Sequence, residues 1–246
     1  LYRVFDFGSA ADPFKIKHAM RPYIDYQFQP KVDEDDIADL ASRGQSITNA
    51  FSYGIENAFT YKIMGQDEVT GEIVPLYREF MRLNLSHSFD LYEYRSDSED
   101  GRYWGNVEGR LEFEPVSYLY LEAESSWNLY KNRFEEINAS IVASDKRGDY
   151  ISIDYLNTYD STHQINLKLR LAITTDWYLG YINRKDLRAE IDYEQSYEVG
   201  YEGQCWGAKV MYVDKHYSEQ GYWIVFSLGG FGELLGFGRM ESVSSE

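Results

Sequence analysis

The sequence predicts an all-β fold, an antiparallel transmembrane β-barrel of which this chain forms the C-terminal portion, about thirteen strands of a larger barrel. Apolar and polar residues alternate with a period of two over long stretches of the 246 residues, which places one set on each face of a strand. No segment shows the 3.6-residue period of an amphipathic helix. No apolar run approaches the roughly 18 to 20 residues that a membrane helix needs.

The alternation is clearest between residues 164 and 173. Leucine and isoleucine occupy the odd positions from Ile165 to Ile173, whereas Asn166, Lys168 and Arg170 occupy even positions. The same pattern occurs in "SITNAFSYGIENAFTYKI", "EFMRLNLSHSFDLY" and "NVEGRLEFE". Each stretch is therefore expected to form a strand with one apolar and one polar face.

Turn signals divide the chain into about thirteen such stretches. We expect strands near residues 1–7, 15–29, 46–64, 76–94, 102–114, 117–130, 133–144, 149–157, 162–174, 176–183, 187–201, 204–214 and 220–229. Many of them reach the roughly 9 to 11 residues that a tilted strand needs to cross a bilayer. Residues 1–232 are assigned to the barrel and residues 233–246 to a C-terminal tail.

Alternation alone fits two architectures. A soluble sandwich or barrel points its apolar residues inward, whereas an outer-membrane barrel points them toward lipid around a polar lumen. Aromatic residues near strand ends favour the membrane barrel, because their rings suit the headgroup level; they are Tyr118, Tyr120, Trp127, Tyr130, Trp177, Tyr178, Tyr201 and Trp206. The formal charge of -17 argues against a nucleic-acid partner, whose phosphates need a basic face.

The first residues already read as a strand and a turn, with no initiating methionine and no signal-peptide pattern. We therefore expect the chain to be a fragment of a longer protein.

A block near the start of the chain, "KIKHAMRPYIDYQFQP", places His18, Pro22, Tyr26 and Pro30 at four-residue steps. Together with "SITNAFSYGIENAFTYK", "REFMRLNLSHSFDLYE", "YEGQCWGAKVMYV" and "GYWIVFSLGGFG", this block resembles the barrel of the LptD family, the lipopolysaccharide-assembly proteins of the Gram-negative outer membrane. The likeness extends in order from about residue 15 to residue 232. It implies an outer-membrane location and the C-terminal half of a very large barrel, without its periplasmic N-terminal domain and earlier strands.

Cys205 is the only cysteine in the sequence. The resemblance implies that it forms a disulfide with a cysteine in or near the missing N-terminal region. An odd cysteine in an oxidising compartment also suggests a partner outside the sequence; the alternative is a free, semi-buried thiol. Some members of the family carry two adjacent cysteines here, whereas this chain has Gln204 before Cys205, so one bond at most is expected. Counting back from a last strand that ends in the periplasm puts Cys205 at the periplasmic edge.

The resemblance further implies a translocon component that inserts lipopolysaccharide into the outer leaflet through a polar lumen and a lateral gate. The resemblance places the lateral opening at the seam between the first strand of the barrel, which is absent here, and the last strand, residues 220–229. Gly221, Tyr222, Trp223, Ile224, Val225 and Phe226 lie at the centre of this expected gate strand. Glycines 221, 229 and 230 either soften this seam or mark turns. The residues expected to face the lumen are Arg82, Asn84, Glu108, Arg110, Glu112, Tyr118, Tyr120, Glu122, Asn166, Lys168, Arg170, Arg188, Glu190 and Asp192.

Enzymatic chemistry and cofactors are not expected. The histidines at 18, 87, 163 and 216 show no metal-ligand spacing, and no nucleophile motif occurs. The acidic stretch over residues 33–39 lacks the glycine and terminal glutamate of a calcium loop. We expect it to be a solvated charge run, with divalent ions bridging it to lipopolysaccharide phosphates as the alternative.

The partners implied by the resemblance are lipopolysaccharide, a small LptE-like lipoprotein that plugs the lumen, and a periplasmic lipopolysaccharide-bridge protein that meets the N-terminal domain. Two other classes of function stay open at this point. One is a porin-like diffusion channel or another outer-membrane barrel transporter, and the other is a soluble extracellular carbohydrate-binding β-protein.

Overall fold

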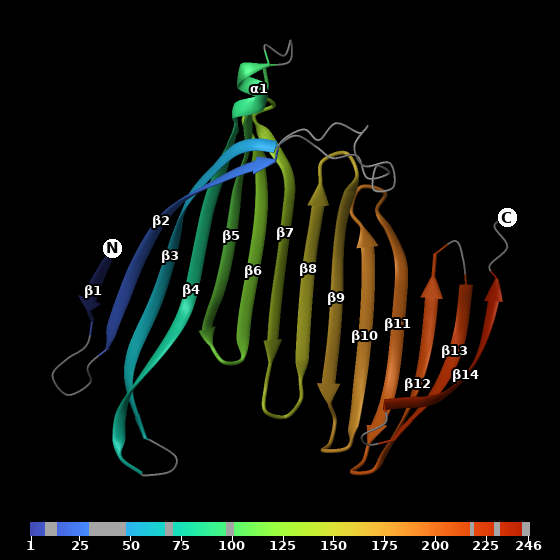
Figure 1. The fold of residues 1–246 in the computed structure, drawn as a ribbon. Helices are drawn as coiled ribbons and strands as arrows, with labels where there is room; N and C mark the ends of the chain where they lie inside the picture. The colour runs from blue at the N-terminus through green and yellow to red at the C-terminus, as the bar shows by residue number, and fades with distance from the viewer. Residues whose placement is uncertain are drawn as a thin grey trace, which may run out of the picture. The chain divides into compact units, whose positions relative to one another are not determined.

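The computed structural model describes residues 1–7, 14–29, 48–66, 71–96, 101–216, 219–228 and 232–242. Over these residues, fourteen strands pair in the order in which they occur in the sequence (Figure 1). The strands are β1 (Tyr2–Asp6), β2 (Lys15–Gln29), β3 (Thr48–Gln66), β4 (Ile73–Asp90), β5 (Trp104–Val116), β6 (Leu119–Asn128), β7 (Arg133–Ser144), β8 (Tyr150–Thr158), β9 (Thr162–Ala172), β10 (Trp177–Asp186), β11 (Ile191–Glu202), β12 (Trp206–Lys215), β13 (Glu219–Leu228) and β14 (Gly232–Ser242). One short helix, α1 (Leu91–Arg95), follows β4, and no helix in the described ranges is long and apolar enough to cross a membrane.

The predicted all-β, antiparallel fold is confirmed. Each of the thirteen expected strands has a counterpart among β1 to β13, because period-two alternation over ten or more residues suits a two-faced strand. Neighbouring arrows from β8 to β13 run in opposite directions in Figure 1, as hairpin connections require.

The prediction that residues 220–229 form the last strand is wrong, because β14 pairs with β13 from Glu219↔Ser242 to Leu228↔Gly232. The count that started from residues 220–229 as the last strand therefore no longer places Cys205 at the periplasmic edge. The segment that was assigned to a tail, "ELLGFGRM", contains glycine at every second position over part of its length. Glycine is depleted in strands and weakens the local pattern. The segment forms a strand because its backbone pairs with β13, and the sequence of residues 232–242 alone does not indicate this pairing.

The chain divides into two compact units. Unit 1 comprises Leu1–Phe113 and Glu124–Glu135, and unit 2 comprises Glu114–Ala123 and Glu136–Glu246.

In unit 1, strand register separates a polar face from an apolar face. Arg21 pairs with Glu56, Glu56 with Asn84, and Asn84 with Arg110. One residue along, the pairs are Pro22 with Ile55, Ile55 with Leu85, and Leu85 with Gly109. Cross-strand partners share a face of the sheet, so each face keeps its character across four strands.

Unit 2 has the same division. Leu171, Leu179, Val199, Val210 and Ile224 are successive cross-strand partners from β9 to β13 and make up its apolar face. Arg170, Lys168, Asp154 and Ser152 occupy the alternate positions of β9 and β8 on the polar face.

Exposure is inverted relative to a soluble protein. The side chains that are buried among the described residues are Ser126, Ser152, Tyr178, Ser196 and Val213. All five lie on the polar faces, as their register and hydrogen bonds show. By contrast, Val199 is 47% exposed and Val210 is 50% exposed. The apolar faces are therefore the ones that lack a covering layer within each unit.

Candidate functional site

The polar face of unit 1 contains a hollow of about 260 Å³ that is lined only by polar and charged residues. Its walls come from β2, β3, β4 and β5, and they are Arg21, Glu56, Arg82, Asn84, Arg110 and Glu112. The register brings these residues together, because Glu56 pairs with Arg21 and Asn84, and Arg82 pairs with Glu112. The hollow combines three guanidinium groups with carboxylates and an amide.

The three arginines form ion pairs around this hollow. Arg21 pairs with Glu56. The Nη2 atom of Arg82 lies 2.8 Å from Glu79 Oε1, and its Nε atom lies 3.9 Å from Glu56 Oε1. Each charge is paired and also solvated, since the Arg21 side chain is 77% exposed and that of Arg82 is 47% exposed. Exposed pairs of this kind exchange readily with other ligands because each contributes little stability.

Arg110 extends the network toward β6. Its Nε atom lies 3.1 Å from Glu112 Oε1, and its Nη1 atom lies 2.9 Å from Glu124 Oε1. On the same face, the buried hydroxyl of Ser126 accepts a hydrogen bond from Asn106 Nδ2 and donates one to Glu108 Oε1, both at 2.8 Å. The polar face of unit 1 is therefore a continuous hydrogen-bonded surface rather than isolated charges.

The polar face of unit 2 is organised around Tyr178. The Arg170 guanidinium carbon lies 3.8 Å from the centroid of the Tyr178 ring. The same guanidinium donates two hydrogen bonds to the Glu202 carboxylate, at 3.1 and 2.6 Å. This bidentate geometry fixes the arginine over the ring.

Most of the residues expected in the lumen lie on the polar faces. The register places Arg82, Asn84, Glu108, Arg110 and Glu112 together in unit 1. In unit 2 it places Asn166, Lys168 and Arg170 together. Tyr120 and Glu122 lie two residues apart in β6, where the tyrosine hydroxyl donates to Glu122 Oε2 at 3.2 Å.

Four residues of that set are placed differently. Tyr118 lies in the turn between β5 and β6, and Arg188 and Glu190 lie in the turn between β10 and β11. Asp192 pairs with Lys185 and accepts a hydrogen bond from Asn183 Nδ2 at 3.0 Å, which puts it on the face of Asn183. Asp192 changes face because the register shifts between Arg184 and Lys185. A bulge of this kind adds a residue on one strand and reverses the face of the residues beyond it.

The aromatic residues that were expected near the ends of β10, β11 and β12 lie on both faces of the sheet. Trp177, Tyr201 and Trp206 cluster on the apolar face, with ring centroids 5.3 and 4.8 Å apart. Tyr178 is not part of this cluster, because it follows Trp177 in the strand and so points to the opposite face, where it is 7% exposed.

Three of the four motif residues share one face of β2. His18 stacks on Phe59, with ring centroids 4.2 Å apart, and its Nε2 atom lies 2.9 Å from Asn57 Oδ1. The Tyr26 hydroxyl donates to Asn49 Oδ1 at 2.9 Å. Pro22 lies between them, and Pro30 lies outside the described residues, as does the acidic stretch of residues 33–39.

Cys205 is an exposed, unbonded thiol in the turn between β11 and β12. The Gly203 N–H donates to the Trp206 carbonyl at 2.9 Å and closes this turn. In the described ranges, His, Cys, Asp and Glu side chains do not gather in a group of three that would hold a metal ion.

Comparison with known proteins gives one family match. A family model described as LptD, LPS transport system D, matches residues 14–191. No individual curated protein matches the chain.

Proposed function

Because the chain belongs to the LptD family, whose members transport lipopolysaccharide to the outer membrane, we propose that it forms part of the translocon that inserts lipopolysaccharide into the outer leaflet. The inverted exposure of the sheet carries this proposal. Val199 and Val210 on the apolar face are about half exposed, whereas Ser196 on the polar face is 8% exposed. A transmembrane barrel has this arrangement, with apolar residues toward lipid and polar residues toward the lumen.

The polar faces supply a hydrated path for the lipopolysaccharide glycan. Its phosphates and hydroxyl groups match the guanidinium, carboxylate and amide groups of the unit 1 hollow. Since Arg82 and Arg110 are each about half exposed and already paired, an incoming phosphate exchanges one ion pair for another. No residue of the path needs to perform bond-making chemistry.

The lengths of the connections indicate which ends of the strands face the periplasm. Outer-membrane barrels have short periplasmic turns and longer extracellular loops. The connections of residues 30–47 and 91–103 follow the even-numbered strands β2 and β4, whereas Cys205 follows the odd-numbered strand β11. In an antiparallel meander, Cys205 then lies at the opposite end of the strands, which we assign to the periplasm, where a cysteine outside residues 1–246 would be able to reach it. This supports the disulfide that the family resemblance implies.

The proposed lateral gate involves β13, with Gly221 to Phe226 at its centre. This strand is paired on both sides, with β12 and with β14. A gate at β13 therefore requires β14 to release its edge. The irregular register between Phe226 and Ser227 favours release there, because a bulge interrupts the hydrogen-bond ladder.

The proposed partners are those that the family resemblance implies. A small LptE-like lipoprotein in the lumen would contact the polar faces, and a periplasmic bridge protein would deliver lipopolysaccharide to an N-terminal domain. The ion pairs of Arg82 and Arg110 offer the plug and the lipopolysaccharide exchangeable hydrogen-bond donors.

Site-specific photocrosslinking of the full-length protein in growing cells tests the proposal. A photoreactive residue at Asn84 on the polar face is expected to form lipopolysaccharide adducts that disappear when export from the inner membrane is interrupted. Leu85, its neighbour on the apolar face of the same strand, serves as the matched control, because it contacts resident lipid regardless of supply. A porin-like channel would give no lipopolysaccharide adduct at Asn84, and that result would overturn the proposal.

A further inference from the structure

The polar face of unit 1 carries three lysines close together near one end of β2 and β3. Lys15 and Lys62 are direct cross-strand partners, and Lys17 is the next residue of β2 on the same face. Direct partners stand about 5 Å apart at their Cβ atoms, and diagonal neighbours such as Lys17 and Lys62 stand roughly 7 to 8 Å apart. We call these three residues the lysine patch.

The lysine patch carries an excess of positive charge. Lys15 Nζ lies 2.9 Å from Asp6 Oδ2. Over the described ranges, Lys17 and Lys62 have aromatic contacts but form no ion pair. Like charges at cross-strand distance repel each other, and a bound anion would relieve this repulsion. The excess is notable in a chain whose formal charge is -17.

An exposed tyrosine lies against each of the two lysines that have no ion pair. Lys17 Nζ is 5.2 Å from the centroid of the Tyr2 ring, and Lys62 Nζ is 5.8 Å from that of the Tyr77 ring. The two tyrosines are 73% and 67% exposed. A cation–π contact at an exposed site is weak, so both ammonium groups stay available to a stronger ligand.

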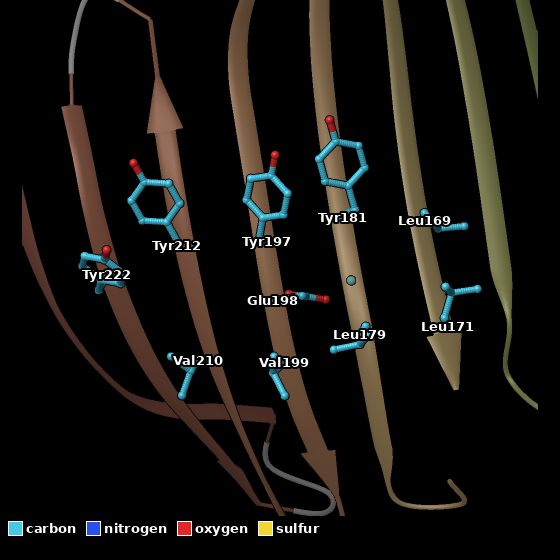
Figure 2. Close-up of a pocket in the computed structure, with 11 residues that line it drawn as sticks. Leu169, Leu171, Leu179, Tyr181, Tyr197, Glu198, Val199, Val210, Tyr212 and Tyr222 are labelled. Atoms are coloured by element: carbon cyan, nitrogen blue, oxygen red, sulfur yellow. The ribbon is translucent and has the colours of Figure 1, made fainter. Parts of the chain in front are cut away.

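These two tyrosines differ from those on the apolar faces. Figure 2 shows Tyr181, Tyr197 and Tyr212 on the apolar face of unit 2, in the same hollow as leucine and valine side chains. Rings in that setting suit the membrane interface. Tyr2 and Tyr77 instead lie beside ammonium groups on a polar face, so membrane anchoring does not account for them.

The lysine patch lies on the same face as the polar hollow of unit 1. Thr60 is the cross-strand partner of both Lys17 and Glu79. Glu79 is held by Arg82 at 2.8 Å, and Arg82 lines the hollow. Lys15 is the first residue of β2, at the end of the strands that we assign to the periplasm. Cargo that enters from the periplasm therefore meets the patch before the hollow.

We propose that the lysine patch binds a phosphorylated sugar of the lipopolysaccharide glycan. This inference rests on the proposed function, which brings lipopolysaccharide along this face. Lysine ammonium groups donate charge-assisted hydrogen bonds to phosphate oxygens, and the C–H face of a sugar ring packs against an exposed phenol ring. A phospholipid would bring its acyl chains with its phosphate, and a polar face gives those chains no cover. An acidic peptide would neutralise the lysines and leave both rings unused.

Photocrosslinking with purified components tests the site. The full-length protein, with its partners and in mild detergent, carries a photoreactive residue at Thr60, between β2 and β4 on the polar face. The probe is purified lipopolysaccharide with its phosphates intact or removed. The intact probe is expected to form an adduct, and removal of the phosphates is expected to lower the yield roughly tenfold.

Substitution of the lysines provides a second measurement. Lys17→Gln combined with Lys62→Gln is expected to lower the yield from the intact probe to a similar extent, because it removes both unpaired cations. Lys146 is exposed in the turn between β7 and β8, and Lys146→Gln, the matched control, is expected to leave the yield unchanged. Heat-modifiable gel mobility shows that each barrel is folded.

Competition identifies the occupant. Glucose 6-phosphate is expected to lower the adduct yield at a concentration at which inorganic phosphate, or phosphatidylglycerol in mixed micelles, does not. Equal competition by either of these would overturn the inference, since any phosphate would then occupy the patch. An adduct with a partner protein in place of lipopolysaccharide would assign the patch to a peptide and also overturns it.

Equal yields from the intact and the dephosphorylated probe overturn the inference too, as does the absence of any adduct at Thr60. Neither result touches the proposed function, which is measured separately by the adducts at Asn84 in growing cells. Absence of lipopolysaccharide adducts at Asn84 is the result that counts against the proposed function itself.

Discussion

Tyr178 and Gly200 are direct cross-strand partners on β10 and β11, and the tyrosine ring lies over the glycine. A Cβ atom on Gly200 would overlap the ring, including its Cζ and Cε1 atoms. The Arg170 guanidinium carbon also lies over this ring, 3.8 Å from its centroid. Unit 1 repeats the relationship, since Tyr23 lies over Gly54 and a Cβ there would meet the Tyr23 hydroxyl at 2.7 Å. Glycine therefore lets bulky rings lie flat against the polar faces.

Gly200→Ala is expected to destabilise the barrel by about 1 to 3 kcal/mol, because the added methyl group forces the Tyr178 ring out of its place. Urea unfolding in detergent measures the change. Gly109→Ala is the control, since its Cβ would meet only the Ser125 hydroxyl, at 3.1 Å, and Leu85 Cδ2, at 3.5 Å. If the ring is the cause, Gly200→Ala adds little in a Tyr178→Ala background. An equal loss in both backgrounds would contradict this account.

Arg82→Gln is expected to slow the arrival of new lipopolysaccharide at the cell surface by roughly fivefold, about 1 kcal/mol in the barrier. The change removes the cation that lies 2.8 Å from Glu79 and leaves the Glu79 carboxylate to repel lipopolysaccharide phosphates, whereas Glu56 keeps its ion pair with Arg21. Adding Glu79→Gln is expected to restore part of the rate. Arg102, which is exposed and precedes β5, provides the control substitution Arg102→Gln. The rate is read from the access of an extracellular lipopolysaccharide-modifying enzyme, and an unchanged rate in Arg82→Gln would be the opposing result.

Cys205→Ser is expected to abolish a reductant-sensitive shift in the gel mobility of the full-length protein. An exposed thiol in a tight turn is accessible to a second cysteine. A disulfide to a segment far away in the chain closes a long loop, and the lost chain entropy raises the free energy of the unfolded state by an amount on the order of 4 to 5 kcal/mol. Non-reducing gels of outer-membrane extracts provide the measurement. A wild-type protein that migrates identically with and without reductant would leave Cys205 as a free thiol.

A disulfide between Ile224→Cys and Phe237→Cys is expected to block lipopolysaccharide delivery until reductant is added. These residues are cross-strand partners of β13 and β14, so the bond prevents β14 from releasing the proposed gate strand. Met211→Cys with Trp223→Cys joins β12 to β13 and is expected to leave delivery unchanged. Normal delivery in the fully oxidised β13–β14 pair would show that delivery does not require β13 and β14 to separate.

Local pattern was sufficient for the strands and their faces. Lys168 and Leu169 must point to opposite sides of any extended strand, so the alternation in β9 predicts both faces without knowledge of its neighbours. The sole cysteine and the motif blocks likewise indicate the family without knowledge of the tertiary structure. The weak alternation of residues 232–242 gave no such signal, and β14 was missed.

The sequence by itself determined the all-β architecture, the strand positions and the division into polar and apolar faces, because a period of two is a property of each strand alone. Tertiary structure decided which side chains meet. The face of Asp192 depends on the bulge at Arg184 and Lys185. The row of tyrosines on the apolar face of unit 2 depends on the register that makes Tyr181, Tyr197, Tyr212 and Tyr222 successive cross-strand partners. Register between strands sets these contacts, and register is a relation between segments that no single segment contains.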